Sequence, residues 1–140
     1  MIETTINKIS TIKSWYNGIP RDFSDISTLL YTRKALSCAI FDLGIHTGES
    51  VKAYEQAEGR RKFEFSSEFN ALCENHSGQI AKEKANILVK DLIKKEKECK
   101  AIVSSLKIVL ETSKNLLDAM AAQIRFLEDE RKRINFSQNT

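Results

Sequence analysis

The stretch of sequence that decides the fold covers residues 99–120 and reads CKAIVSSLKIVLETSKNLLDAM. Its apolar residues recur at spacings of three and four, and the same heptad pattern extends over residues 79–135. A hydrophobic repeat of this length predicts one long helix that supercoils against partner helices. The a and d residues predicted to form the core of a bundle or an oligomer are Val103, Leu106, Leu110, Leu117, Met120, Ile124 and Leu127.

The apolar stripe of this helix is wider than a two-stranded coiled coil needs. Three polar residues interrupt the a and d positions, namely Glu96, Ser113 and Arg131, while the neighbouring g positions add Ile102, Val109 and Leu116. A broad apolar stripe is typical of helices that contact several others. The pattern therefore favours a bundle or ring, and it leaves open whether the partner helices come from one chain or from several copies.

Two further helices are expected before the heptad helix, one short over residues 3–17 and one long over residues 24–74. Pro20 separates them because it lacks a backbone donor and disfavours helical geometry in the preceding residue, so Asp22 or Ser24 is expected to cap the second helix. Gly44 and Gly48 allow a kink within it.

The turn residues at 75–78 then leave room only for a tight connection, which predicts antiparallel packing of the long helices. The length of 140 residues and the single proline favour one all-α domain over residues 1–140, formed by long antiparallel helices in a helical bundle or coiled coil. The formal charge of +3 does not by itself require a nucleic-acid or membrane partner.

The sequence also bears on the cellular compartment. Three cysteines without a Cys-x-x-Cys pair predict reduced thiols rather than a disulfide framework or a thiolate metal site. The N-terminus lacks the features of a secretory signal, and no apolar run is long enough to span a bilayer. We expect a cytoplasmic protein without a membrane partner.

Catalytic and metal-binding patterns give little support to an enzyme. Asp42, His46 and Glu49 share one helical face at spacings of four and three, which is the closest set to a metal or acid–base site. Three polar residues on a helix are more often a solvated surface, and no nucleophile motif or phosphate-binding loop occurs. We therefore expect no enzyme activity, no metal and no cofactor.

One cluster indicates a class of partner. Arg60, Arg61 and Lys62 precede Phe63, and such residues can neutralise phosphates and stack on unpaired bases; Lys82 and Lys84 add charge further along. The alternative is a solvated basic face beside core aromatic residues at helical spacing, Phe65 and Phe69. Because each basic group is small, an oligomer would have to repeat it to form a strong binding surface.

The segment 108–120, IVLETSKNLLDAM, resembles the C-terminal helix of the UvsY-type recombination mediator proteins of T4-type bacteriophages. In that family an aliphatic triplet and an acidic residue precede a Leu-Asp-Ala-aliphatic run. The resemblance covers the second half of the chain and includes the turn at Ser77 and Gly78. It implies an oligomer that binds single-stranded DNA and helps to load a recombinase, in the cytoplasm of the host cell. The alternative is a structural or scaffold protein, such as a virion component, that acts through helix–helix contacts.

Overall fold

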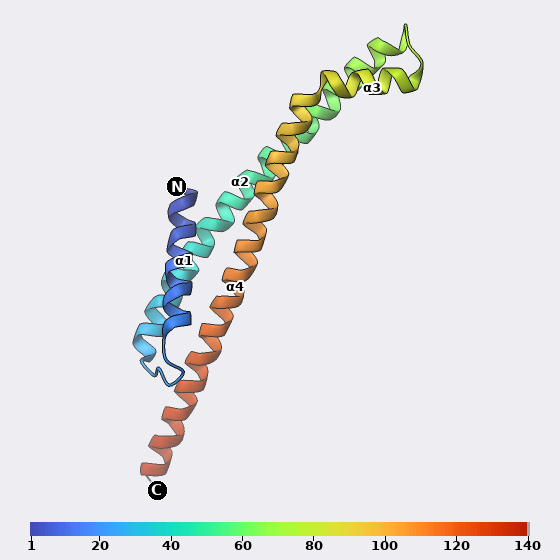
Figure 1. The fold of residues 1–140 in the computed structure, drawn as a ribbon. Helices are drawn as coiled ribbons and strands as arrows, with labels where there is room; N and C mark the ends of the chain where they lie inside the picture. Colours follow the sequence, from blue (N-terminus) through green and yellow to red (C-terminus); the bar gives the residue numbers. More distant parts are fainter. Residues whose placement is uncertain (140) are drawn as a thin grey trace. The chain divides into compact units, whose positions relative to one another are not determined.

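The computed structural model describes residues 1–139, which hold four α-helices and no strand (Figure 1). The helices are α1 (Ile2–Gly18), α2 (Ile26–Cys73), α3 (Gly78–Leu88) and α4 (Lys90–Gln138). The all-α prediction is confirmed. Two of the helices, α2 and α4, are far longer than an ordinary globular helix of three or four turns.

The connection between α1 and α2 is a short turn around Pro20. Ile19 is extended, and the Phe23 amide donates to the carbonyl oxygen of Pro20 at 3.1 Å. Asp25 caps α2, because its Oδ1 accepts the Thr28 backbone amide at 3.1 Å and its Oδ2 accepts the Thr28 hydroxyl at 2.7 Å. The expected caps, Asp22 and Ser24, are therefore corrected to Asp25, whose carboxylate is placed to reach the first turn.

Helix α2 is continuous through Gly44 and Gly48, so neither glycine ends the helix. The long C-terminal helix, in contrast, is divided. Val89 lies outside helical geometry at φ −98° and ψ 15°, and it separates α3 from α4 where one helix was predicted over residues 79–135. Helical hydrogen bonds are kept on both sides of Val89. The Val89 amide donates to the Ala85 carbonyl at 3.1 Å, and the Ile93 amide donates to the Val89 carbonyl at 3.0 Å. The interruption is thus confined to a single residue.

The contacts within the chain gather in two compact units. Unit 1 combines residues 1–46 with residues 107–139, and unit 2 comprises residues 47–106. The first half of α2, all of α1 and the second half of α4 belong to unit 1. The second half of α2, all of α3 and the start of α4 belong to unit 2.

The core of unit 1 forms between the long helices. Leu29, Leu36 and Leu43 recur every seven residues on α2 and are fully buried, as is Met120 on α4. Ile124 is 5 % exposed and packs with Ile26 and Leu29, while the other predicted core residues of this unit are half-buried, namely Leu110, Leu117 and Leu127. In unit 2, Val103 and Leu106 are buried. The predicted a and d residues therefore face helices of their own chain.

Helix α1 is held in unit 1 by aromatic residues at its end. Trp15 meets Phe23 edge to face, with ring centroids 5.8 Å apart, and both pack against the core of α2 and α4. The Tyr16 hydroxyl donates to Oε1 of Gln123 at 2.9 Å, and the Gln123 amide nitrogen donates to the Phe23 carbonyl at 3.4 Å. These bonds join residues that are 107 and 100 positions apart in the sequence.

The polar residues that interrupt the heptad pattern have different surroundings. Ser113 is 2 % exposed and satisfies its hydroxyl within its own helix, by donating to the Val109 carbonyl at 2.6 Å. Glu96 is half-buried and paired with Arg61, whereas Arg131 is exposed. Of these three residues, only Arg131 is exposed to solvent, at the end of the apolar stripe of α4.

Candidate nucleic-acid interface in unit 2

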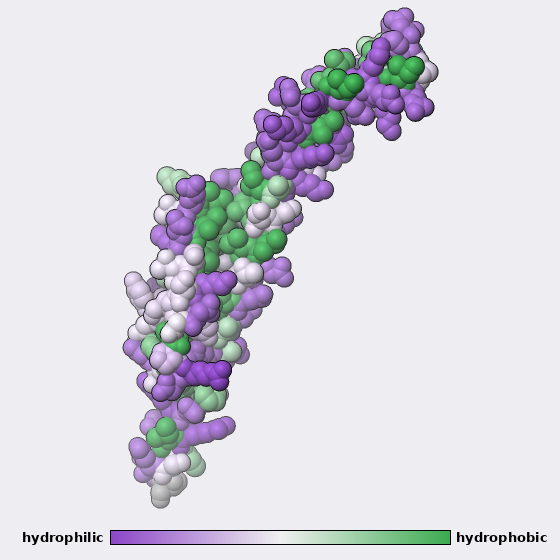
Figure 2. Space-filling model, in the orientation of Figure 1, coloured by the Kyte–Doolittle hydropathy of each residue, from purple (hydrophilic) through white to green (hydrophobic). Residues whose placement is uncertain are grey.

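All six residues predicted to contact nucleic acid belong to unit 2. Arg60, Arg61, Lys62 and Phe63 lie on α2, and two lysines, Lys82 and Lys84, lie on α3. The visible face of this part of the molecule is mostly hydrophilic, with a few hydrophobic residues among the polar ones (Figure 2). Their individual surroundings decide which of the six side chains are available to a ligand.

Arg61 is engaged inside the protein. Its Nε donates to Oε2 of Glu96 at 2.6 Å, and its Nη2 donates to Oε1 at 3.1 Å. The two side chains are 27 % and 15 % exposed, so the pair is partly shielded from water. A bidentate pair of this kind fixes both groups in direction as well as in distance. Two of the Arg61 donors are consequently used to join α2 to α4.

The pair also changes the proton affinity of both groups. Hydrogen bonding to the Arg61 guanidinium lowers the pKa of Glu96 below its ordinary value. The same bonds to the carboxylate raise the pKa of Arg61. Both groups therefore stay charged throughout the neutral range, and the ion pair persists there.

The neighbouring lysines have weaker partners. Lys62 contacts Oε1 of Glu58 at 2.6 Å, one turn earlier on α2, but its side chain remains 61 % exposed. Lys84 lies on α3 with its ammonium 3.3 Å from Nε2 of His76. Exposed pairs of this kind exchange easily with solvent or with a phosphate. Lys82 is exposed at the edge of a hollow that Phe69 and Gln79 also line.

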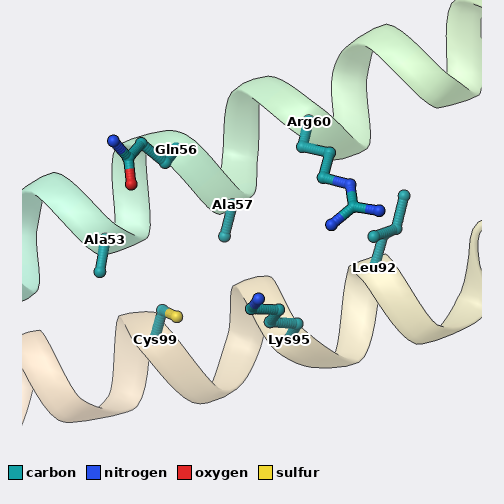
Figure 3. A pocket seen from close by; sticks show the side chains of 7 residues that line it. All are labelled: Ala53, Gln56, Ala57, Arg60, Leu92, Lys95 and Cys99. Carbon is teal, nitrogen blue, oxygen red and sulfur yellow. The ribbon is translucent and has the colours of Figure 1, made fainter.

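Arg60 projects from α2 toward α4 and lines a hollow of about 310 Å³ (Figure 3). Lys95 of α4 lines the same hollow, so two cationic side chains from different helices share it. Ala53 and Ala57 leave space because their side chains are small, and Figure 3 places Ala53 across from Cys99. Lys95 was not among the predicted contacts, because its position next to Arg60 depends on the register between α2 and α4.

Phe63 is the most exposed residue of the aromatic cluster, at 72 %. Its neighbours one turn away are small or polar, since Gly59 lies four residues before it and Ser66 and Ser67 lie three and four residues after it. Phe65 and Phe69 are instead half-buried and stack on each other with centroids 5.9 Å apart. The ring of Phe63 is thus open to a ligand, whereas the other two rings support the helix packing.

The net charge of unit 2 is small. Residues 47–106 contain 11 Lys and Arg against 10 Asp and Glu, a difference of one positive charge. A long-range positive field does not follow from such a balance. Any attraction for an anion must arise locally, for example in the hollow that Arg60 and Lys95 share, because none of its lining residues is acidic.

The possible metal site at Asp42, His46 and Glu49 is not assembled. Within residues 1–139, no three His, Cys, Asp or Glu side chains come together in a way that could hold a metal ion. Asp42 and Glu49 are exposed and His46 is half-buried. The cysteines of the described chain are free thiols. None of the helices between residues 1 and 139 has the length and apolar character that crossing a bilayer requires.

Comparison with known proteins gives no assignment. No family model matches the chain, and neither the curated proteins nor the solved structures contain a match.

Proposed function

We propose that the protein is a non-enzymatic, oligomeric helical protein that binds single-stranded DNA through unit 2 and assists recombinase loading in phage recombination. The observation that carries this proposal is the open ring of Phe63 next to Arg60 on α2. Stacking of one base on an aromatic side chain contributes about 1–3 kcal/mol and does not depend on base identity. The resemblance of residues 108–120 to the UvsY type adds the biological setting.

Arg60 and Phe63 are separated by one helical turn, so the two side chains can serve consecutive parts of one nucleotide. The residues around Phe63 on the helix surface carry no acidic group, namely Gln56, Gly59, Ser66, Ser67 and Asn70. One acidic residue, Glu64, lies one turn after Arg60 on α2, and it is half-buried. Lys82 and Lys95 are further candidates, while Arg61 serves the ion pair with Glu96.

The arrangement of helices within unit 2 supports an antiparallel hairpin as the binding element. Along α2, Ala53 lies across from Cys99 and Arg60 lies across from Leu92 (Figure 3). Residue numbers thus rise along one helix and fall along the other. Assembly of several copies would bring several Arg60 and Phe63 side chains to one strand, which raises the overall affinity without any new contact.

Fluorescence anisotropy with a labelled single-stranded oligonucleotide tests the proposal. We expect binding at low salt whose logarithmic affinity falls linearly with logarithmic salt concentration, and Arg60→Ala should reduce that slope by about 0.7 per protein copy. Phe63→Ala should weaken binding at every salt concentration.

Two matched variants serve as controls for this experiment. Phe126→Ala removes a ring that is 61 % exposed in unit 1, and Arg61→Ala removes the neighbouring but engaged arginine. Phe126→Ala should weaken DNA binding less than Phe63→Ala does, and Arg61→Ala should weaken it less than Arg60→Ala does. Absence of binding at low salt, or equal effects of Phe63→Ala and Phe126→Ala, would contradict the proposal.

A second candidate function is a structural or scaffold protein that acts through helix–helix contacts, for example a virion component. Large apolar side chains at the surface of unit 1 favour it, since Tyr31, Phe41 and Phe126 are each more than half exposed. This candidate predicts stable protein complexes and indifference to single-stranded DNA. The anisotropy experiment therefore separates the two functions.

A further inference from the structure

The first half of α2 has apolar residues on two opposite faces. The inner face carries Leu29, Leu36 and Leu43, which are spaced by seven residues and fully buried. The outer face carries a second set with the same spacing, Tyr31, Cys38 and Ile45, and all three are exposed. A helix that is covered on one side needs only one such set. The second set therefore requires a separate explanation.

The outer face is continuous over about four turns. Leu30 is 45 % exposed, Tyr31 78 %, Phe41 70 % and Ile45 50 %. With a rise of about 1.5 Å per residue, the stripe from Leu30 to Ile45 is about 22 Å long. Neighbouring large apolar groups on a surface mark an interaction site more reliably than scattered ones.

The heptad core of α4 is not available for this purpose. Met120 and Ile124 in unit 1, like Val103 and Leu106 in unit 2, are already buried within the chain. Oligomerisation through these residues would require the chain to exchange its own helices for those of a neighbour. A second copy that approaches the folded chain must use another surface.

The charges on the outer face are arranged symmetrically about Cys38. Lys34 lies four residues before it and Asp42 four residues after it, and both are exposed. If two copies of α2 pair antiparallel about a two-fold axis at Cys38, each Lys34 lies opposite Asp42 of the second copy. Parallel pairing would instead oppose Lys34 to Lys34 and Asp42 to Asp42. Like charges face each other in that case, so the charges select the antiparallel arrangement.

The apolar residues fit the same axis. Tyr31 lies opposite Ile45 of the second copy, so a larger side chain meets a smaller one. A two-fold interface is self-complementary in this way, because each contact occurs twice. We propose that a second copy of the chain docks on the outer face of α2, antiparallel and centred on Cys38. This proposal does not depend on DNA binding.

Light scattering of the purified chain at increasing protein concentration gives the first test. We expect dimers, or larger assemblies built from them, and Phe41→Glu should reduce the association at least tenfold. Phe126→Glu, which changes a similarly exposed ring on α4, should leave it unchanged. Both variants alter surface residues, and circular dichroism verifies that they remain helical. A wild-type chain that stays monomeric, or equal effects of the two variants, would overturn the proposal.

Exchange of the charges gives a second test that also determines direction. Lys34→Asp and Asp42→Lys should each weaken the dimer about tenfold, because each creates two like-charge contacts. The double variant restores both attractive contacts in the antiparallel dimer and should recover the wild-type affinity. Failure of the double variant to recover would overturn the antiparallel arrangement.

Cross-linking locates the axis. A chain that keeps only Cys38, through Cys73→Ser and Cys99→Ser, should form a covalent dimer with a short bis-maleimide. A chain that keeps only Cys73, which is also exposed, should remain monomeric on denaturing gels under the same conditions. Equal cross-linking of the two chains would contradict the assignment of Cys38 to the axis. In the chain that keeps only Cys38, the further substitution Phe63→Ala should leave the cross-linking unchanged. This result would separate the interface from the DNA-binding surface.

Discussion

Arg61 and Glu96 are joined by two hydrogen bonds of 2.6 and 3.1 Å, and they connect α2 to α4 within unit 2. The heptad pattern places Glu96 at a position that should be apolar, and the basic cluster places Arg61 among the phosphate contacts. The ion pair explains why a charged residue occupies the apolar position 96, and it engages the Arg61 side chain that was predicted to contact phosphate. A carboxylate in a half-buried core position is tolerated when an arginine fixes it in a bidentate pair.

Arg61→Ala should lower the free energy of unfolding by about 1 kcal/mol, because it leaves the shielded Glu96 carboxylate without its partner. Urea unfolding followed by circular dichroism measures the change. Lys62→Ala provides the matched control, since its contact with Glu58 is exposed and should contribute less than about 0.5 kcal/mol. A double-mutant cycle with Glu96→Ala should return a favourable coupling energy. Additive effects of the two substitutions would show that the pair contributes nothing.

The contribution of this pair should disappear in acid. Arg61 lowers the pKa of Glu96 in the folded state, so the folded chain binds a proton less readily than the unfolded chain. The stabilisation is complete above the ordinary glutamate pKa of 4.5 and is lost as the pH falls through the lowered value. The difference in unfolding free energy between wild type and Arg61→Ala should thus be constant near neutral pH and shrink below about pH 4. A difference that grows in acid would refute this assignment.

The helical nature of the chain was predictable from sequence because the heptad pattern of residues 79–135 and the stop at Pro20 are local signals. The register between α2 and α4 and the attachment of α1 were not, because they depend on contacts between distant residues, such as Arg61 with Glu96 for the register and Tyr16 with Gln123 for α1. The same limit applies to the candidate site. The exposed Phe63 follows from its position off the apolar stripe, whereas Lys95 joins Arg60 only through the register of two helices.

Asp25→Ala should destabilise the start of α2, as the loss of an N-cap typically does. Both carboxylate oxygens of Asp25 accept hydrogen bonds from Thr28, and these bonds lower the pKa of Asp25. Asp25→Asn retains an acceptor for the Thr28 amide and should have a smaller effect. Thermal unfolding followed by circular dichroism compares these variants with Asp22→Ala, whose position lies before the cap. An equal loss of stability in Asp22→Ala would contradict the role of Asp25.

Tyr16→Phe should weaken the attachment of α1 to unit 1 by about 0.5–1.5 kcal/mol, because it removes the hydroxyl that donates to Gln123. Hydrogen exchange of the α1 amides measures the effect locally. Exchange should accelerate in α1 and change little in α3, which belongs to unit 2. Tyr31→Phe removes a hydroxyl at an exposed position on α2 and should leave the exchange of α1 unchanged. Unaltered exchange in Tyr16→Phe would show that packing alone holds the helix.

Two adjacent leucines of α2 offer the sharpest test of the packing in unit 1. Leu29 is fully buried against Ile26 and Ile124, whereas Leu30 is 45 % exposed on the outer face. Leu29→Ala removes the same atoms as Leu30→Ala but leaves a cavity, so it should lower the free energy of unfolding by about 2–4 kcal/mol. Leu30→Ala should lower it by less than about 1 kcal/mol. Because the two residues share sequence context and helix propensity, urea unfolding isolates the effect of burial. A reversed order would mean that the outer face of α2, and not the inner one, carries the core.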